Sequence, residues 1–298
     1  MSLRACLLSE GLRRIEKPWL ARVEDPQDLR RSLDRKGQLL FPGPRGVARR
    51  WVTCGIPALR LDPPKRRLGA TLLYLHGGGY VFGSPRSHRT MVARLVHAAG
   101  LPAILPAYRL APEHPFPAAP DDALAAYADL SAQGPVILGG DSAGGGLALA
   151  LLGDIRAHGL PQPLALFAMS PLTDFTFSGA SFRDNARTEA LLPAERAGEL
   201  AQMYLQGADP ADPRASPLSA DLTGAPPVWL SFDTTEILRD DTTRLAARLR
   251  AQGTQVTLHE GKGLPHVWPF FQPWLPEARA TLTEIAAFLT SESPRSGS

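Results

Sequence analysis

Short apolar runs alternate with longer helical patterns along the chain from about residue 70 onward. The apolar runs predict strands at residues 70–76, 102–107, 135–139, 164–170, 228–232 and 255–260. The patterns between them predict helices at residues 89–99, 120–132, 143–157, 239–251 and 276–291. Runs that stay apolar at successive positions suit strands buried on both faces. We therefore predict an α/β fold with a mostly parallel sheet and crossover helices, preceded by a hairpin at residues 47–52 and 58–61.

Two segments do not follow this alternation. Residues 1–45 predict one or two amphipathic helices that end at the sequence Phe41-Pro-Gly-Pro. Residues 174–225 interrupt the alternation between two core strands and contain many aromatic and apolar residues. An insertion of this length is usually functional, and a lid over a site is the natural expectation. We expect one domain, with a core of residues 46–173 and 226–298 and a helical cap made of the two exceptional segments.

The composition supports a large buried core. The chain has 298 residues, of which 44% are hydrophobic, and this excludes wholesale disorder. Its 32 Lys and Arg against 29 Asp and Glu leave a formal net charge of +3. The positive residues are nearly all scattered arginines without interleaved aromatic residues, so no surface for nucleic acid is predicted.

Neither a membrane segment nor a metal site is indicated by the sequence. No window approaches the ~20 apolar residues of a transmembrane helix. Charged residues between positions 4 and 17 break any signal-peptide core, so we expect a cytoplasmic protein with no membrane partner. Two cysteines exclude a disulfide-stapled scaffold. No H-E-x-x-H, cysteine-pair or EF-hand pattern occurs, so we expect neither a metal nor a cofactor.

The strongest motif is the G-x-S-x-G at residues 140–144, Gly-Asp-Ser-Ala-Gly. It directly follows the apolar strand sequence Pro-Val-Ile-Leu-Gly and precedes a helix rich in Ala and Leu. This strand–turn–helix context is what a nucleophile elbow requires. A helix that merely begins with a serine cap is the alternative interpretation. The motif predicts Ser142 as the nucleophile.

A second motif, His76-Gly-Gly-Gly-Tyr80, follows another predicted strand. Three consecutive glycines leave backbone N–H groups free to point into a cavity, as an oxyanion hole requires. We expect the amides of Gly78, Gly79 and Ala143 to hold a developing alkoxide. A flexible turn or a phosphate-binding nest would explain the glycines alone, but not their combination with G-x-S-x-G.

The catalytic base must follow the serine and the acid in chain order. Only His259 and His266 lie far enough along the chain to do so. His259 alternates with apolar residues inside a predicted strand, which is typical of a structural position. His266 lies in the loop between the last strand and the last helix, and it is the predicted base.

Three segments together carry a family resemblance. They are the glycine motif at His76, the sequence Tyr-Arg-Leu-Ala-Pro-Glu-His-Pro-Phe-Pro-Ala-Ala from residue 108, and Gly-Asp-Ser-Ala-Gly-Gly from residue 140. They resemble the hormone-sensitive-lipase family of α/β-hydrolase esterases, over residues 46–289. The resemblance implies the α/β-hydrolase fold with eight strands, a cap, and hydrolysis of short-chain carboxylic esters. An amidase or arylacetamide deacetylase would carry the same triad, whereas a non-catalytic receptor on this fold is disfavoured because His266 is present.

The resemblance also indicates the triad acid. The family pattern D-P-L-R-D-E begins with the catalytic Asp, and aligning L-R-D-E with residues 238–241 puts Glu236 in its place. The separation of Glu236 from His266 matches the usual spacing in the family. Glu departs from the commoner Asp, but it can orient a histidine in the same way. Asp233 and Asp240 remain the alternatives.

The aromatic residues of the cap favour an apolar pocket for a small-molecule ester. The candidate substrate contacts are Tyr80, Phe82, Phe175, Tyr204 and Trp268. Pairing of Arg109 with Glu113 is expected to lock the proline-rich loop after residue 108. The sequence is also compatible with a homodimer.

Overall fold

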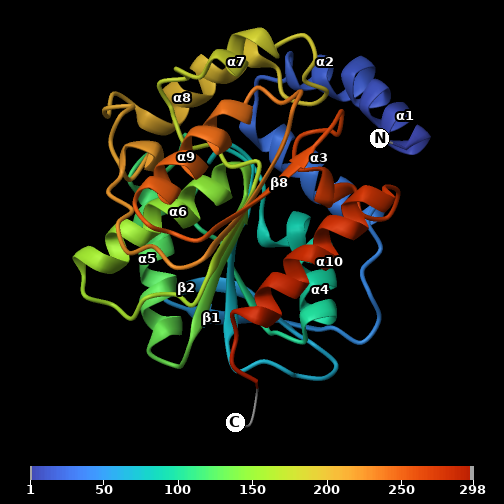
Figure 1. Cartoon of the computed structure of the whole chain (residues 1–298). Helices are drawn as coiled ribbons and strands as arrows, with labels where there is room; N and C mark the ends of the chain where they lie inside the picture. The colour runs from blue at the N-terminus through green and yellow to red at the C-terminus, as the bar shows by residue number, and fades with distance from the viewer. Residues whose placement is uncertain (1, 296–298) are drawn as a thin grey trace.

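The computed structural model describes residues 2–295, and its centre is a sheet of eight strands (Figure 1). The strands are β1 (Ala48–Cys54), β2 (Ile56–Asp62), β3 (Thr71–Leu75), β4 (Ala103–Pro106), β5 (Val136–Asp141), β6 (Leu166–Met169), β7 (Val228–Asp233) and β8 (Val256–Gly261). Their order in the sheet is β1-β2-β4-β3-β5-β6-β7-β8. β2 runs antiparallel to β1 and β4, and the neighbours from β4 to β8 are parallel. The predicted mostly parallel sheet is confirmed.

Helices cover both faces of this sheet. They are α4 (Pro85–Ala99), α5 (Ala118–Ser131), α6 (Ser142–Ala157), α9 (Arg239–Ala251) and α10 (Pro276–Ser291). Figure 1 shows α4 and α10 on one side of the sheet and α5, α6 and α9 on the other. Successive strand residues point to opposite faces. Leu73 and Leu138 therefore pack in the core with α5 and α6, whereas Leu72 and Ile137 pack with α4 and α10.

A helix cap and a one-residue turn explain where three elements differ from their predicted bounds. α4 begins at Pro85, ahead of the predicted residue 89. The hydroxyl of Ser84 accepts from the amide of Ser87 at 3.1 Å, and the Ser87 hydroxyl accepts from the amide of Ser84 at 2.9 Å. This capping box, with Pro85 at the first helical position, starts the helix before its apolar pattern begins. β1 and β2 are longer than the predicted hairpin strands because Gly55 alone separates them.

Two segments lie above the carboxyl ends of the strands, and we call them the cap (Figure 1). The N-terminal segment forms α1 (Leu3–Gly11), a π-helical turn (Leu12–Glu16), α2 (Lys17–Leu20) and α3 (Pro26–Leu39). The insertion forms α7 (Ala180–Asp184), α8 (Ala197–Leu205) and two 3-10 turns (Ala194–Arg196 and Pro217–Ser219). A further 3-10 turn, Trp268–Phe271, follows β8.

Cationic side chains join the two parts of the cap through backbone carbonyl groups. The guanidinium of Arg196, in the insertion, donates to the carbonyl oxygens of Ala21 at 3.1 Å and Val23 at 3.0 Å. The ammonium of Lys17, in the N-terminal segment, donates to the carbonyl oxygens of Ala186 at 2.8 Å and Glu189 at 3.0 Å. The two segments are therefore bound to each other in both directions.

The N-terminal segment also locks the proline-rich loop. Arg30 of α3 lies 2.7 Å from the carboxylate of Glu113 and donates to the carbonyl oxygen of Ala111 at 2.8 Å. Arg109 instead binds Asp122 of α5 at 2.8 Å. The expected pairing of Arg109 with Glu113 is therefore wrong, because each residue has a partner on a helix outside the loop.

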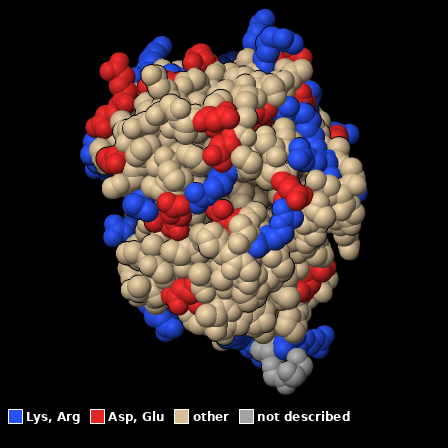
Figure 2. Space-filling model, turned by 90° about the vertical axis from the view of Figure 1, so that its left-hand side faces the viewer, with Lys and Arg blue, Asp and Glu red and all other residues tan. Residues whose placement is uncertain are grey.

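The surface carries charges of both signs. On the face drawn in Figure 2, Lys and Arg alternate with Asp and Glu and form no field of one sign. Within residues 2–295, no helix has the length and apolar character needed to cross a membrane. Cys6 is exposed and Cys54 is buried, and both are free thiols.

Candidate active site

Ser142 lies at the junction where β5 ends and α6 begins, with no loop between them. Its φ of +52° is in the left-handed region, which is strained for a residue other than glycine. A Cβ on Gly140 would lie 2.3 Å from the carbonyl oxygen of Gly144, and a Cβ on Gly144 would lie 2.1 Å from that of Leu75. The two glycines of G-x-S-x-G are therefore required by the close approach of the backbone on either side of the serine.

The glycine motif after β3 lies beside Ser142. Gly77, Gly78 and Gly79 line the same cavity as Ser142. Among the described residues, the amides of Gly78 and Gly79 donate no hydrogen bond to another backbone or side-chain group. The amide of Ala143 lies in the first turn of α6, where N–H groups have no partner within the helix. These three amides can stabilise negative charge on an oxygen atom bound next to Ser142.

Asp141 ties the glycine motif to the serine turn, a role that sequence reasoning missed. Its buried carboxylate accepts from the Gly77 amide at 3.0 Å and from the Tyr74 hydroxyl at 2.6 Å, and it lies 3.3 Å from Nε2 of His88. Burial by itself would raise the pKa of Asp141, but His88 and the bonds from His88 and Tyr74 outweigh it and hold this pKa below its usual value. The sequence did contain a signal for this role, namely an acidic residue directly before Ser142 at the end of a buried strand. Burying a carboxylate there costs free energy unless hydrogen-bond donors surround it.

The structure brings His266 and Glu236 together. Nδ1 of His266 lies 3.0 Å from Oε2 of Glu236, and their exposed fractions are 4% and 1%. Burial alone would lower the pKa of His266, but the charge and hydrogen bond of Glu236 raise it above its usual value, with smaller contributions from Glu189 and Asp141. Nε2 of His266 is buried and has no hydrogen-bond partner among the described residues. This nitrogen is free to exchange a proton in the cavity.

The second oxygen of Glu236 is held by groups that the sequence did not single out. Oε1 accepts from the hydroxyl of Ser170 at 2.7 Å and from the amide of Asp233 at 3.1 Å. Ser170 directly follows β6 and has a φ of +47°. Its hydroxyl also accepts from the amide of Val267, next to His266, at 3.3 Å. One serine therefore contacts the carboxylate and the backbone that carries the imidazole.

The alternative acids hold backbone loops and do not contact the imidazole. Asp233 accepts from the amides of Gly263 at 3.1 Å and Leu264 at 2.8 Å, in the loop that leads to His266. Asp240 accepts from the amide of Ser181 at 2.9 Å. His259 lies 2.7 Å from Glu284, on α10. Among these candidates, only Glu236 is hydrogen-bonded to His266.

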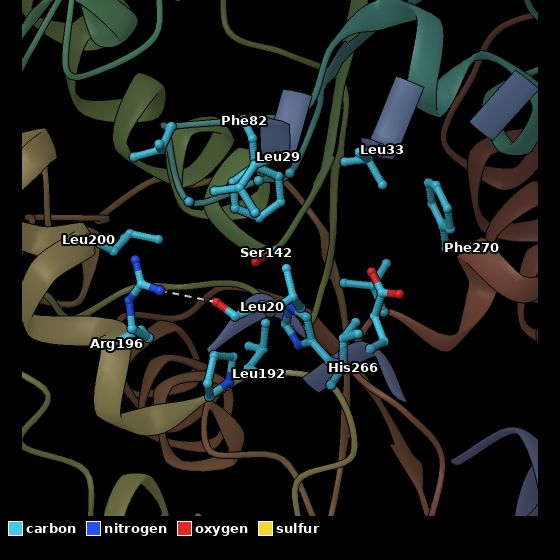
Figure 3. Close-up of a pocket in the computed structure, with 18 of the residues that line it drawn as sticks. Leu20, Leu29, Leu33, Phe82, Ser142, Leu192, Arg196, Leu200, His266 and Phe270 are labelled. Carbon is cyan, nitrogen blue, oxygen red and sulfur yellow. Dashed lines mark hydrogen bonds between the residues drawn. The ribbon is translucent and has the colours of Figure 1, made fainter. Parts of the chain in front are cut away.

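A cavity of about 370 Å³ extends from Ser142 and His266 into the cap. Figure 3 shows these two residues near the middle of the view, with leucines from the N-terminal segment and the insertion around them. The labelled apolar residues of its wall are Leu20, Leu29, Leu33, Phe82, Leu192, Leu200 and Phe270. The wall is predominantly apolar and comes from segments that are far apart in the sequence.

Only Phe82 of the five expected substrate contacts lines this cavity. The rings of Tyr80 and Tyr204 stack at 4.0 Å between centroids, and Phe175 packs on Tyr204 at 5.2 Å. Trp268 is buried and donates from its indole nitrogen to the hydroxyl of Thr281 at 3.0 Å. The expectation was wrong for Tyr80, Phe175, Tyr204 and Trp268 because large rings bury the most area, and here they form core under the cap.

Comparisons with known proteins identify the same fold and relatives named as hydrolases and esterases. A family model described as "alpha/beta hydrolase fold" matches residues 72–270. An acetyl-hydrolase of Streptomyces hygroscopicus is 41% identical over 283 residues, which cover 92% of this chain and 93% of that protein. An esterase of Acinetobacter venetianus is 34% identical over 273 residues, or 89% of each chain.

Solved structures match over almost the whole chain. The esterase EstE5, soaked with p-nitrophenyl butyrate, superposes with a TM-score of 0.92 at 36% identity and covers 98% of this chain and 99% of its own. An esterase from the bacterial hormone-sensitive lipase family superposes with a TM-score of 0.91 at 37% identity, with the same coverage.

The ring stack under the cap gives a prediction for Tyr204→Phe. The hydroxyl of Tyr204 is buried without a partner among the described residues, so its loss should leave kcat and KM for a short ester unchanged. The free energy of unfolding should stay the same or rise by about 1 kcal/mol, because an unsatisfied buried group is removed. Ester kinetics and denaturant unfolding measure both quantities.

Tyr74→Phe is the matched control, because its hydroxyl does have a partner. It donates to Asp141 at 2.6 Å. This variant should lose about 1.5–3 kcal/mol of stability, the usual contribution of a hydrogen bond to a charged group. A higher KM in Tyr204→Phe would show that this hydroxyl contacts substrate after all.

Proposed function

The chain belongs to the hormone-sensitive-lipase-like family of α/β-hydrolase esterases, and on this premise we propose that it is a serine carboxylesterase for short-chain acyl esters. One observation carries the proposal. His266 is bound through Nδ1 to a buried Glu236, while its Nε2 has no partner among the described residues and lies in the cavity that Ser142 lines. This is the arrangement that a nucleophile–base–acid triad needs.

The chemistry begins with attack of the Ser142 hydroxyl oxygen on the ester carbonyl carbon. Nε2 of His266 takes the hydroxyl proton, and Glu236 accepts the Nδ1–H and stabilises the imidazolium that forms. The carbonyl oxygen becomes negatively charged and is held by the amides of Gly78, Gly79 and Ala143. Such a donor is worth about 3 kcal/mol of transition-state stabilisation in comparable hydrolases.

The alcohol leaves when the tetrahedral intermediate collapses. His266 gives its proton to the leaving oxygen, and the acyl group remains on Ser142 as an ester. A water molecule then attacks this acyl-enzyme, again losing a proton to His266, and the carboxylic acid is released with the serine restored.

The apolar cavity of about 370 Å³ supports a short-chain substrate. Its lining is predominantly apolar, and the two cationic side chains in it have acidic partners, Lys36 with Glu16 and Arg196 with Glu199. Two relatives are consistent with small acyl groups, since one is named an acetyl-hydrolase and the other was soaked with p-nitrophenyl butyrate.

Ser142→Ala should abolish ester hydrolysis without unfolding the chain. Loss of the nucleophile in a serine protease lowers kcat by about 10⁶-fold, and we expect a loss of that order. The melting temperature should remain near that of the wild type, because the side chain is only partly buried at the edge of a cavity. Release of p-nitrophenol from the acetate ester measures the activity, with the exposed Ser291→Ala as control. Turnover in Ser142→Ala equal to that of the wild type contradicts the serine mechanism.

Glu236→Gln should keep the serine and the oxyanion amides in place while it removes the charge that orients His266. Losing the orienting carboxylate of a triad lowers kcat by about 10⁴-fold. Asp240→Asn, matched in chemistry, should retain most activity, because Asp240 binds a cap amide and not the imidazole. If Asp240→Asn were inactive and Glu236→Gln stayed near wild type, the assignment of the acid would be wrong.

Acyl-chain preference tests the proposed substrate class. Across the p-nitrophenyl esters acetate, butyrate, octanoate and laurate, kcat/KM should fall steeply after the short members, because the cavity of about 370 Å³ limits the length of chain that it holds. Initial rates below the solubility limit of each ester provide the measurement. A laurate ester turned over faster than the butyrate ester speaks against a short-chain esterase.

A further inference from the structure

The turn that carries Glu236 is bound by the cap insertion along its whole length. Asn185 donates from its side-chain amide to the carbonyl oxygens of Thr234 at 3.0 Å and Glu236 at 2.8 Å. The hydroxyl of Thr188 donates to the carbonyl oxygen of Thr235 at 3.4 Å. Three successive carbonyl groups of the turn therefore have partners in one short piece of the insertion.

Glu189 completes this set of contacts from a fully buried position, with an exposed fraction of 0%. Its Oε2 accepts from the amide of Ile237, the residue after the triad acid, at 3.2 Å. Its Oε1 accepts from the amides of Leu191 at 2.9 Å and Leu192 at 3.4 Å. Both leucines line the cavity. One carboxylate therefore joins the wall of the cavity to the turn that carries Glu236, which we call the acid turn (residues 234–237).

A buried carboxylate is costly unless donors surround it, and here three backbone amides do. The segment is also held from its other side, because Lys17 donates to the carbonyl oxygen of Glu189 at 3.0 Å and Arg13 to that of Thr188 at 2.9 Å. The N-terminal segment, the insertion and the acid turn thus form successive bonded layers.

We propose that Glu189 is a positioning residue of the catalytic site, which fixes the turn that bears Glu236 and adds a second carboxylate near His266. The inference rests on the proposed function. It makes the insertion part of the support of the triad as well as a wall of the pocket. Glu189 touches no reacting atom, so it acts through Glu236 and His266.

The charge of Glu189 provides a readout that packing alone would not change. Burial is the main cause that raises the pKa of Glu236, and the Glu189 carboxylate adds to it. The same carboxylate contributes, after Glu236, to raising the pKa of His266. The other charged groups that act on His266 are Glu236 and Asp141. The cavity that His266 lines is also lined by further titratable side chains, those of Glu16, Glu24, Lys36, His88, Arg196 and Glu199. Removing the Glu189 charge lowers the pKa of His266, so the imidazole stays neutral to a lower pH and the acid limb of the rate profile moves down in pH.

The test is Glu189→Gln, which keeps the shape of the side chain and removes the charge. An amide has one acceptor oxygen and cannot serve Leu191 and Ile237 together. We expect kcat for p-nitrophenyl acetate to fall by about 10²-fold, as for a displaced catalytic group, with KM little changed. The acid limb of kcat/KM should move to lower pH. Asp184→Asn, an exposed carboxylate in the same insertion, should change neither quantity.

An unchanged kcat together with an unmoved acid limb in Glu189→Gln overturns the inference. A lower melting temperature with an unmoved limb also overturns it, because it shows a structural role alone. If Glu189→Gln does not fold, Asn185→Ser carries the test. An unchanged kcat in that variant counts against the proposal that the insertion positions the turn that bears Glu236. The proposed function fails separately, if Ser142→Ala retains wild-type turnover.

Discussion

The carbonyl groups that end β3 lie so close to the start of α6 that no side chain fits between them. A Cβ on Gly144 would be 2.1 Å from the carbonyl oxygen of Leu75 and 2.4 Å from that of His76. This approach sets the glycine motif and the serine turn side by side, because each continues directly from one of two paired strands. Asp141 then binds across the gap to the Gly77 amide. The geometry of the proposed nucleophile and oxyanion donors thus follows from the packing of two strand ends.

Backbone strain gathers around this centre. Of the six described non-glycine residues with positive φ, four lie in or next to the segments of the proposed site, and two lie in the insertion. The four are Ser142, Ser170, Tyr80 and Val267, and the two are Phe177 and Gln206. Such conformations cost about 1–3 kcal/mol each and persist only where the surroundings over-determine them. Here buried hydrogen bonds supply that constraint, because the Ser170 hydroxyl binds both Glu236 and the Val267 amide. In a buried environment these bonds are strong, and leaving any of their groups unpaired would be costly.

Sequence reasoning succeeded where a physical requirement allows few residue types. Strands buried on both faces must be apolar throughout, and a tight backbone approach must use glycine, so the sheet and the two glycine motifs were visible in the sequence. Pairing between distant side chains leaves no such mark. Arg30 and Glu113 are 83 positions apart in the chain, and no local pattern around either residue predicts that they pair. The sequence-based prediction placed Tyr204 in the pocket, whereas in the structure its ring stacks on Tyr80. The sequence could not distinguish the two positions, because an aromatic residue of an insertion suits core and cavity equally.

Glu189 escaped notice because a glutamate that follows Arg187 and Thr188 resembles solvated surface. Its burial depends on contacts that only the folded chain provides, from the acid turn and from Lys17. The bonds that hold the cap go mostly to backbone groups, as those of Arg196 and Asn185 also do. Backbone partners are present whatever side chain occupies the position, so leucines of the pocket wall can change while the attachment persists. The fold therefore separates the shape of the apolar cavity from the support of the proposed triad, although both use the same insertion.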